Sequence, residues 1–115
     1  MSKLLHYLKI SGPTAADWKV ETKEFRQGED ELAWYQKQVG GMIQVVPLEG
    51  NIIAVCNEEG KIENLPPSVA WMFQGMVHDI MVGNVLVLRS KAPNMVSIQE
   101  EDIPKVKRIL VPVAR

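Results

Sequence analysis

Cysteine and histidine are scarce in this sequence of 115 residues, and that scarcity excludes several kinds of site. A single cysteine, Cys56, cannot close a disulfide within the chain or pair with a second thiolate around zinc. It lies in a β-branched run, so we expect an unreactive, buried thiol. The histidines are His6 and His78, and Asp79 beside His78 does not complete the three or four ligands of a zinc site. We therefore predict no metal centre.

Residue patterns typical of catalysis or phosphate binding are also missing. Neither histidine belongs to a recognisable catalytic pattern that combines a nucleophile with a carboxylate. The adjacent carboxylates at residues 58–59 and 100–102 are typical of solvated turns and helix starts. The glycines form neither a dinucleotide-binding nor a P-loop pattern. The sequence predicts a protein that is not an enzyme, uses no cofactor and acts by binding.

Charge of one sign and long apolar runs are absent as well. Thirteen basic residues stand against fourteen acidic ones, for a net charge of -1, so neither a dedicated duplex binder nor a DNA mimic is favoured. No apolar run approaches the roughly 20 residues that cross a bilayer, and the first residues lack the apolar segment of a signal peptide. We expect a cytoplasmic protein in a reducing compartment, without a membrane partner.

The composition that is present is typical of a folded protein. Apolar residues make up 46% and charged residues 23% of the chain, well away from disordered compositions. A chain of this length suits one hydrophobic core. The prediction is a single domain over residues 1–115.

Local patterns predict an α+β fold built mainly on an antiparallel sheet. Strands are expected at residues 4–10, 18–25, 42–46, 51–56 and 84–89, the last buried on both faces inside the sheet. A helix is expected after Gly28, ending at residues 40–41, and another from about residue 100 to 110 with Pro104 in its first turn. Pro66 and Pro67 are expected to open a further helix reaching Ile80. The predicted sheet has about five strands with two or three helices, in the order β-β-α-β-β-α-β-α.

Two tryptophans stand out in this pattern. On helical wheels, Trp34 and Trp71 fall on the side away from the apolar stripe. Large aromatic side chains left exposed favour a subunit interface or a ligand-stacking surface. The alternative is packing against another element of the same chain. With few elements left to cover two helix backs, we expect a homo-oligomer.

The turn at residues 57–61 is the best candidate for a ligand site. Asn57 and Gly60 tolerate the positive φ of a tight turn, and successive backbone amides in such a turn form a concave anion site. We predict that Asn57, Glu58, Lys61 and Arg89 bind an anionic or nucleotide-like ligand. The alternative is an ordinary hairpin turn.

Four segments in order resemble a family catalogued as domain of unknown function 3846. They are residues 41–46 (GMIQVV), 57–61 (NEEGK), 65–66 (LP) and 79–87 (DIMVGNVLV), so the resemblance covers residues 41–88 and leaves the first forty outside. The family is encoded largely by bacteriophages and other mobile elements. The resemblance implies that setting, in a bacterial host cytoplasm, and supplies no catalytic residues.

The leading functional hypothesis combines these observations. We expect a non-enzymatic accessory protein of a phage or mobile element that acts in counter-defence or host takeover. It would mask a host bacterial protein or sequester a nucleotide-like signal. The alternative is a nucleic-acid-binding accessory or regulatory protein that uses Lys105, Lys107 and Arg108 on the last helix.

Overall fold

Two antiparallel β-sheets form the framework of the protein, for which a computed structural model describes residues 2–114. The larger sheet has the order β2-β1-β7-β4-β3, with β8 added on β7, and the smaller has the order β6-β5-β9. The strands are β1 Lys3–Ile10, β2 Trp18–Phe25, β3 Ile43–Glu49, β4 Ile52–Asn57, β5 Pro67–Phe73, β6 Met76–Val82, β7 Val85–Lys91, β8 Asn94–Val96 and β9 Leu110–Pro112. The helices are α1 Glu31–Val39, α2 Asp102–Ile109 and the short 3-10 helix η1 Ala15–Asp17.

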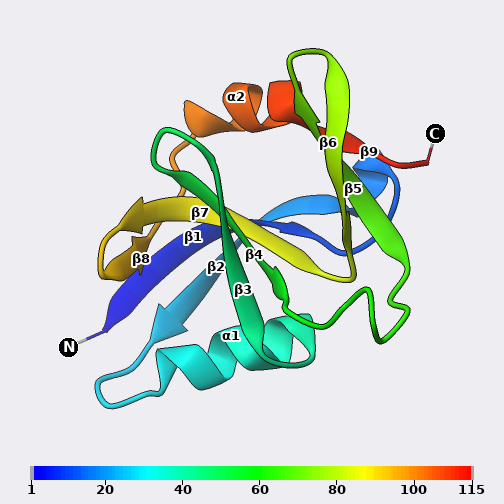
Figure 1. Cartoon of the computed structure of the whole chain (residues 1–115). Helices are drawn as coiled ribbons and strands as arrows, with labels where there is room; N and C mark the ends of the chain where they lie inside the picture. Colours follow the sequence, from blue (N-terminus) through cyan, green and yellow to red (C-terminus); the bar gives the residue numbers. More distant parts are fainter. Residues whose placement is uncertain (1, 115) are drawn as a thin grey trace.

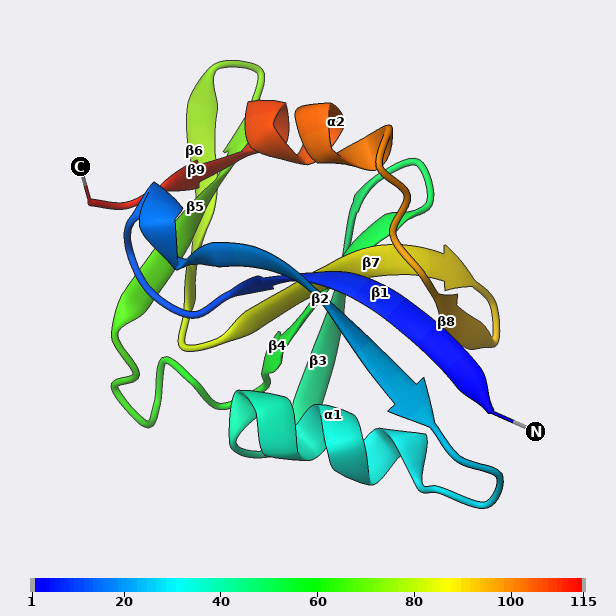
Figure 2. The same cartoon turned by 180° about the vertical axis from the view of Figure 1, so that it is seen from behind.

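The elements stack around the larger sheet. Helix α1 lies below it in Figure 1, whereas α2 and the smaller sheet lie above it, and Figure 2 shows the same order from behind. One cluster of buried side chains joins both sheets and both helices. The protein is therefore one compact α+β domain, as the sequence predicts.

The strands at the centre of the larger sheet are the most apolar ones. All six residues of β4 are buried, and Val85, Leu86, Val87 and Leu88 of β7 have no exposed surface. Because β7 lies between β1 and β4 and is covered on both faces, it has no solvated side that would require alternating polar residues. The prediction that this strand lies inside the sheet is confirmed.

Local signals fix both ends of α1. The Asp30 side chain accepts a hydrogen bond from the Ala33 amide at 3.1 Å, which caps the first turn. Gly40 ends the helix with φ 78°, a conformation that glycine adopts without steric cost. Of the predicted apolar stripe of Leu32, Tyr35 and Val39, the last two are buried, whereas Leu32 is 51% exposed.

The helix predicted from Pro66 to Ile80 is wrong, because this segment forms the hairpin of β5 and β6. Its turn residues Gln74 and Gly75 have φ of 52° and 78°, which matches the two-residue turn that suits the twist of a hairpin. Apolar residues occupy nearly every position on both sides of this turn, so they fit helical spacing as well as strand alternation. The order of elements therefore has a hairpin in place of the second predicted helix.

The C-terminal elements agree better with the sequence. Helix α2 begins at Asp102 and holds Pro104 in its first turn, as predicted. The short strands β8 and β9 were not predicted, because three residues are too few to show an alternating pattern. Strand β9 extends the smaller sheet along β5 directly after α2, so it ties the end of the chain to the hairpin.

Candidate functional site

A cavity of about 350 Å³ lies where the two sheets meet. Gln44 and Val46 of the edge strand β3 and Cys56 of β4 line one side. Trp71 of β5 and residues 79–82 of β6 line the other. The turn after β4 closes the end of the cavity with residues 57, 58, 61 and 62. The cavity therefore gathers Asn57, Glu58, Lys61 and Trp71 among the residues predicted from sequence.

Asn57 builds this turn with its side chain. Its Nδ2 donates to the carbonyl of Val39 at the end of α1 over 3.2 Å, and its Oδ1 accepts from the Glu59 amide over 2.8 Å. The side chain is buried, so both of its polar groups find partners within the chain. Asn57 therefore shapes the turn and ties it to α1, while Glu58 stays exposed at the cavity.

Lys61 reaches from the turn to β6. Its Nζ lies 2.6 Å from Oδ1 of Asp79, and the two side chains are 62% and 46% exposed. The same oxygen accepts a hydrogen bond from the Ile80 amide at 2.8 Å. Partial burial would raise the pKa of Asp79, but the bonds from Lys61 and Ile80 outweigh it, so that the pKa is lowered. An exposed ion pair of this kind opens easily for a ligand, because it is held weakly.

Cys56 lies on the cavity wall, and its chemistry is that of a buried thiol. Burial raises the pKa of Cys56, and the charge of Asp79 raises it further, against an opposing effect of Lys61. Its Sγ donates to the carbonyl of Gln44 at 3.9 Å. With little thiolate present near neutral pH, the side chain is poorly suited to nucleophilic chemistry.

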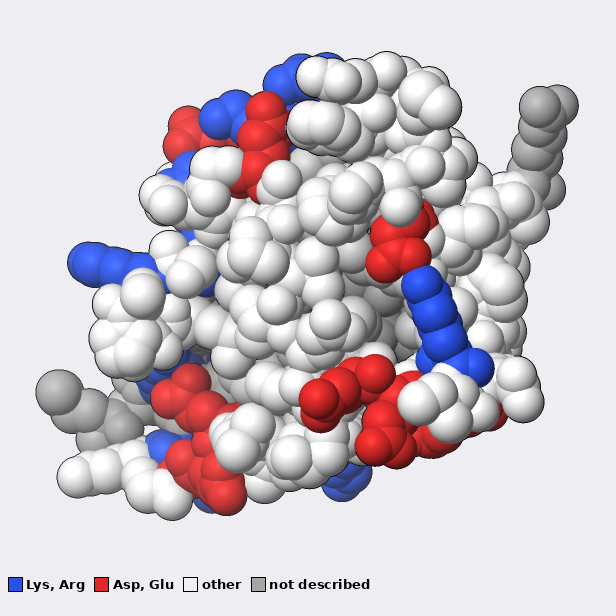
Figure 3. Space-filling view, in the orientation of Figure 1, with Lys and Arg blue, Asp and Glu red and all other residues white. Residues whose placement is uncertain are grey.

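Next to the cavity, the tip of the β5–β6 hairpin leaves large apolar side chains in solvent. Phe73 is 59%, Met76 74% and Val77 56% exposed. We call these three residues the hairpin patch. The tip of the hairpin lies at the top of Figure 1, to the right of α2, and the same part of Figure 3 is free of charged side chains. Phe73 and Met76 lie directly opposite each other and share one face of the hairpin, whereas Val77 lies opposite Met72 on the other face. Exposed apolar surface of this kind on a hairpin tip indicates an interaction site.

A β-bulge connects the hairpin patch with the cavity. Trp71 pairs with Asp79 and Met72 with Val77, which leaves His78 as an extra residue in β6. The His78 ring stands edge-on to Trp71 at 4.6 Å and approaches Phe73 at 6.1 Å between ring centroids. The three rings form one aromatic surface that runs from the hairpin tip to the cavity wall.

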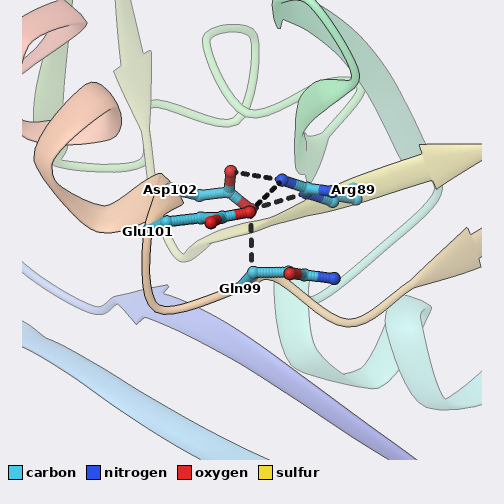
Figure 4. Close-up of polar contacts among 4 residues, drawn as sticks. All are labelled: Arg89, Gln99, Glu101 and Asp102. Carbon is cyan, nitrogen blue, oxygen red and sulfur yellow. Dashed lines mark hydrogen bonds and ion pairs between the residues drawn. The ribbon is translucent and has the colours of Figure 1, made fainter.

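Arg89 does not join the other predicted ligand residues. It lies opposite Ile52, at the far end of β4 from Asn57. Figure 4 shows its guanidinium bound to Asp102 by two hydrogen bonds. Nε donates to Oδ2 at 2.7 Å and Nη2 to Oδ1 at 2.8 Å, and Nη2 also donates to Oε1 of Glu101 at 3.4 Å. Asp102 is 1% exposed, and its Oδ2 also accepts from the Gln99 amide. The pair fastens α2 to β7.

The two tryptophans predicted as interface residues have different surroundings. Trp34 is partly buried in edge-to-face contacts with Tyr7, Phe25 and Tyr35 at 5.0 to 5.3 Å, so its own chain provides packing for it. Trp71 is partly buried and lies on a strand. The prediction that it is exposed on the outer side of a helix therefore does not apply to it. Its place beside the cavity keeps it a candidate for ligand contact.

Sequence reasoning missed the hairpin patch and His78 as site residues. The helix predicted from Pro66 to Ile80 would place Phe73, Met76 and Val77 on a buried apolar stripe, whereas the observed hairpin exposes them. The available signal was the dipeptide Gln74-Gly75 between two apolar runs, because glycine in such a place marks a two-residue turn.

Two kinds of feature are absent from residues 2–114. No group of three or more His, Cys, Asp or Glu side chains in this part of the chain could hold a metal ion. No helix among these residues is long and apolar enough to span a bilayer.

Comparison with protein families places the chain in a wider group. A family model described as a domain of unknown function (DUF3846) matches residues 15–110. The chain belongs to this family. The DUF3846 match begins at the start of η1 and includes β2 and α1, so the expectation that the first forty residues lie outside it is wrong for residues 15–40. No curated protein and no solved structure matches the chain.

Proposed function

We propose that this DUF3846 protein is a non-enzymatic accessory protein of a phage or mobile element that masks a host bacterial protein. The setting is counter-defence or host takeover in the bacterial cytoplasm. The hairpin patch carries the proposal, because Phe73, Met76 and Val77 lie exposed on a hairpin whose fold does not need them buried. Their burial against a partner would supply the favourable free energy of binding.

The cavity beside the patch supports a protein partner over an anionic ligand. Its charged lining residues are Glu58 and Asp79 against Lys61, two carboxylates and one ammonium. Such a balance repels phosphate groups more than it attracts them. A basic or hydrogen-bond-donating side chain of a partner protein fits this lining better, and the Lys61–Asp79 pair would separate to admit it.

Sequestration of a nucleotide-like signal is the alternative mode at the same site, although the charge balance of the lining disfavours it. A volume of about 350 Å³ lies within the usual range of small-molecule pockets, and Trp71 is one of the residues that line it. Titration calorimetry with a panel of mononucleotides and cyclic nucleotides tests this mode. Binding by the wild type that is weakened by Lys61→Ala would support it, and no heat with any nucleotide would remove it.

Co-purification from host cells tests the masking proposal. We expect one host protein to accompany the tagged wild type in stoichiometric amount, and Phe73→Ser with Met76→Ser to lose it. Leu32→Ser is the matched control, because Leu32 is also exposed but lies on α1. Equal recovery with the hairpin variant, or no partner for the wild type, would contradict the proposal.

A second candidate function is nucleic-acid binding through α2. The observation in its favour is that Lys105, Lys107 and Arg108 are all exposed on this helix. Phosphate contacts by these side chains would make the affinity fall steeply with salt, since binding releases counterions. A gel-shift series with DNA and RNA at low salt tests this candidate, repeated with Lys105, Lys107 and Arg108 changed to alanine. A shift that the triple variant loses would support nucleic-acid binding, and no shift with the wild type would remove it.

A further inference from the structure

The outer edge of β2 is an unpaired strand edge. β2 is the last strand of the larger sheet and pairs with β1 along all eight residues. The Ser11 amide donates to the Asp17 carbonyl at 3.2 Å, so residues 19, 21 and 23 bond to β1 and residues 20, 22 and 24 point outward. Within residues 2–114, the outward amides of Val20 and Thr22 make no hydrogen bond. Such an edge is a template for another strand.

The side chains of β2 suit pairing better than those of the other edge of this sheet. β3 carries Pro47, which lacks an amide hydrogen, whereas β2 contains no proline. Val20 is 59% exposed at the middle of β2. On the opposite face, Lys19, Glu21 and Lys23 alternate in charge. An exposed edge with alternating charges selects its partner by charge.

We propose that β2 pairs antiparallel with β2 of a second copy of this chain, about a twofold axis at Val20. In this register, Lys19 lies opposite Glu21 of the second copy. Symmetry repeats this pair, so Lys19 and Glu21 of both copies meet opposite charges. Lys23 keeps its ion pair with Glu29 at 2.8 Å, and Asp17 keeps its bonds to Thr14 within its own chain. On the other face, Val20 meets its counterpart and both valines lose solvent contact.

Charge repulsion also disfavours the neighbouring registers of this strand pair. Moving the axis by one residue toward Glu21 sets Glu21 against Glu21 and Lys19 against Lys23 of the second copy. Moving it the other way sets Lys19 against Lys19 of the second copy. Like charges directly opposite each other are destabilising, so both neighbouring arrangements are disfavoured. The edge therefore favours the arrangement centred on Val20 over the arrangements on either side of it.

The backbone supports the same register. Val20 N–H would donate to Val20 O of the second copy, and Thr22 N–H to Trp18 O of the second copy, each bond repeated by the twofold axis. The Trp18 amide is already bonded to the Ala15 carbonyl and takes no part. This interface lies at the edge of the sheet opposite to β3 and the cavity, so it involves neither Trp34 nor Trp71 and does not depend on the function proposed above.

Sedimentation equilibrium on charge variants tests this dimer. We expect the wild type to dimerise and both Lys19→Glu and Glu21→Lys to raise the dimer dissociation constant roughly tenfold or more, because each turns two attractive pairs into repulsive ones. Mixing the two variants should restore a dimer, since every 19–21 pair is then opposite in charge. Recovery on mixing also shows that each variant is folded.

Two further variants complete the test. Lys91→Glu makes the same charge change on an exposed residue of β7 and should leave the dissociation constant unchanged. Val20→Pro removes an outward amide without removing a bond to β1, and should abolish the dimer. A wild type that stays monomeric at high micromolar concentration would overturn the proposal, as would a dimer that is insensitive to these changes or a mixture that does not associate.

Discussion

The larger sheet and the β5–β6 hairpin differ in how far their apolar side chains are buried. Strands β4 and β7 bury theirs completely, whereas the hairpin holds Val69 and Met81 in the core and leaves Phe73, Met76 and Val77 in solvent. Burial of apolar surface is the main stabilising contribution to folding. The first set therefore maintains the fold, and the second set is free to contact another molecule.

Truncation in the larger sheet should have the largest effect on stability. Leu88→Ala removes a side chain with no exposed surface from the central strand β7. We expect the free energy of unfolding to fall by about 2–5 kcal/mol, from lost burial and the remaining cavity. Urea denaturation measures this change, and a loss below about 1 kcal/mol would show that β7 is not the packed centre of the domain.

Breaking the link between α2 and the larger sheet should come second. Asp102→Ala removes the carboxylate that pairs with the half-buried Arg89. It also removes the acceptor of the hydrogen bond from the Gln99 amide. We expect a cost of about 2–3 kcal/mol, less than for a fully buried pair because Arg89 retains contact with water. The urea midpoint measures it, and Glu101→Ala is the matched control because Glu101 is mainly exposed.

The same pair predicts a dependence on pH. The bidentate bond from Arg89 lowers the pKa of Asp102 below its ordinary value, so the carboxylate stabilises the fold above pH about 4. This stability is lost as the pH falls through the lowered pKa. Urea midpoints at pH 5 and 2.5 should therefore differ less in Asp102→Asn than in the wild type. An equal decline in both proteins would mean that other carboxyls dominate acid unfolding.

The hairpin patch should tolerate change. Phe73→Ser should alter the free energy of unfolding by less than about 0.5 kcal/mol, because the side chain already contacts water in the folded state. A thermal melt beside that of Leu88→Ala sharpens the contrast between the two regions. A loss comparable to that of Leu88→Ala would make the patch part of the core.

The exposed ion pair at the cavity should contribute least. Lys61→Ala removes the partner of Asp79 from a pair that is open to solvent on both sides, so we expect a change within about 0.5 kcal/mol. Urea denaturation at low and high salt checks this, since a screened surface pair loses its effect in salt. A large salt-resistant loss would show that the pair holds the two sheets together.

Local signals predicted most of the larger sheet and both α-helices. These signals act on residues that are close in sequence, so the sequence alone reveals them. They are the capping residues Asp30 and Gly40, the turn glycines and the β-branched runs. The β5–β6 hairpin was missed because a dense apolar run fits both helical and strand periods, and the single Gln74-Gly75 turn decides between them.

The candidate site was only partly predictable, because contacts across the fold assemble it. The turn at residues 57–61 indicated Glu58 and Lys61, and both lie at the cavity. Nothing in the sequence pairs Arg89 with Asp102, thirteen residues away, until α2 docks on β7. The approach of Trp71 and Asp79 to Cys56 likewise depends on how the second sheet packs against the first.

The most direct test of this account is a titration with the host protein that we expect to co-purify with the wild type. Calorimetry should give a dissociation constant at least about tenfold higher for Phe73→Ser with Met76→Ser than for the wild type, while their unfolding temperatures agree. Leu32→Ser should bind like the wild type. Equal affinities for the wild type and the hairpin variant would contradict the claim that the side chains left outside the core are those that recognise a partner.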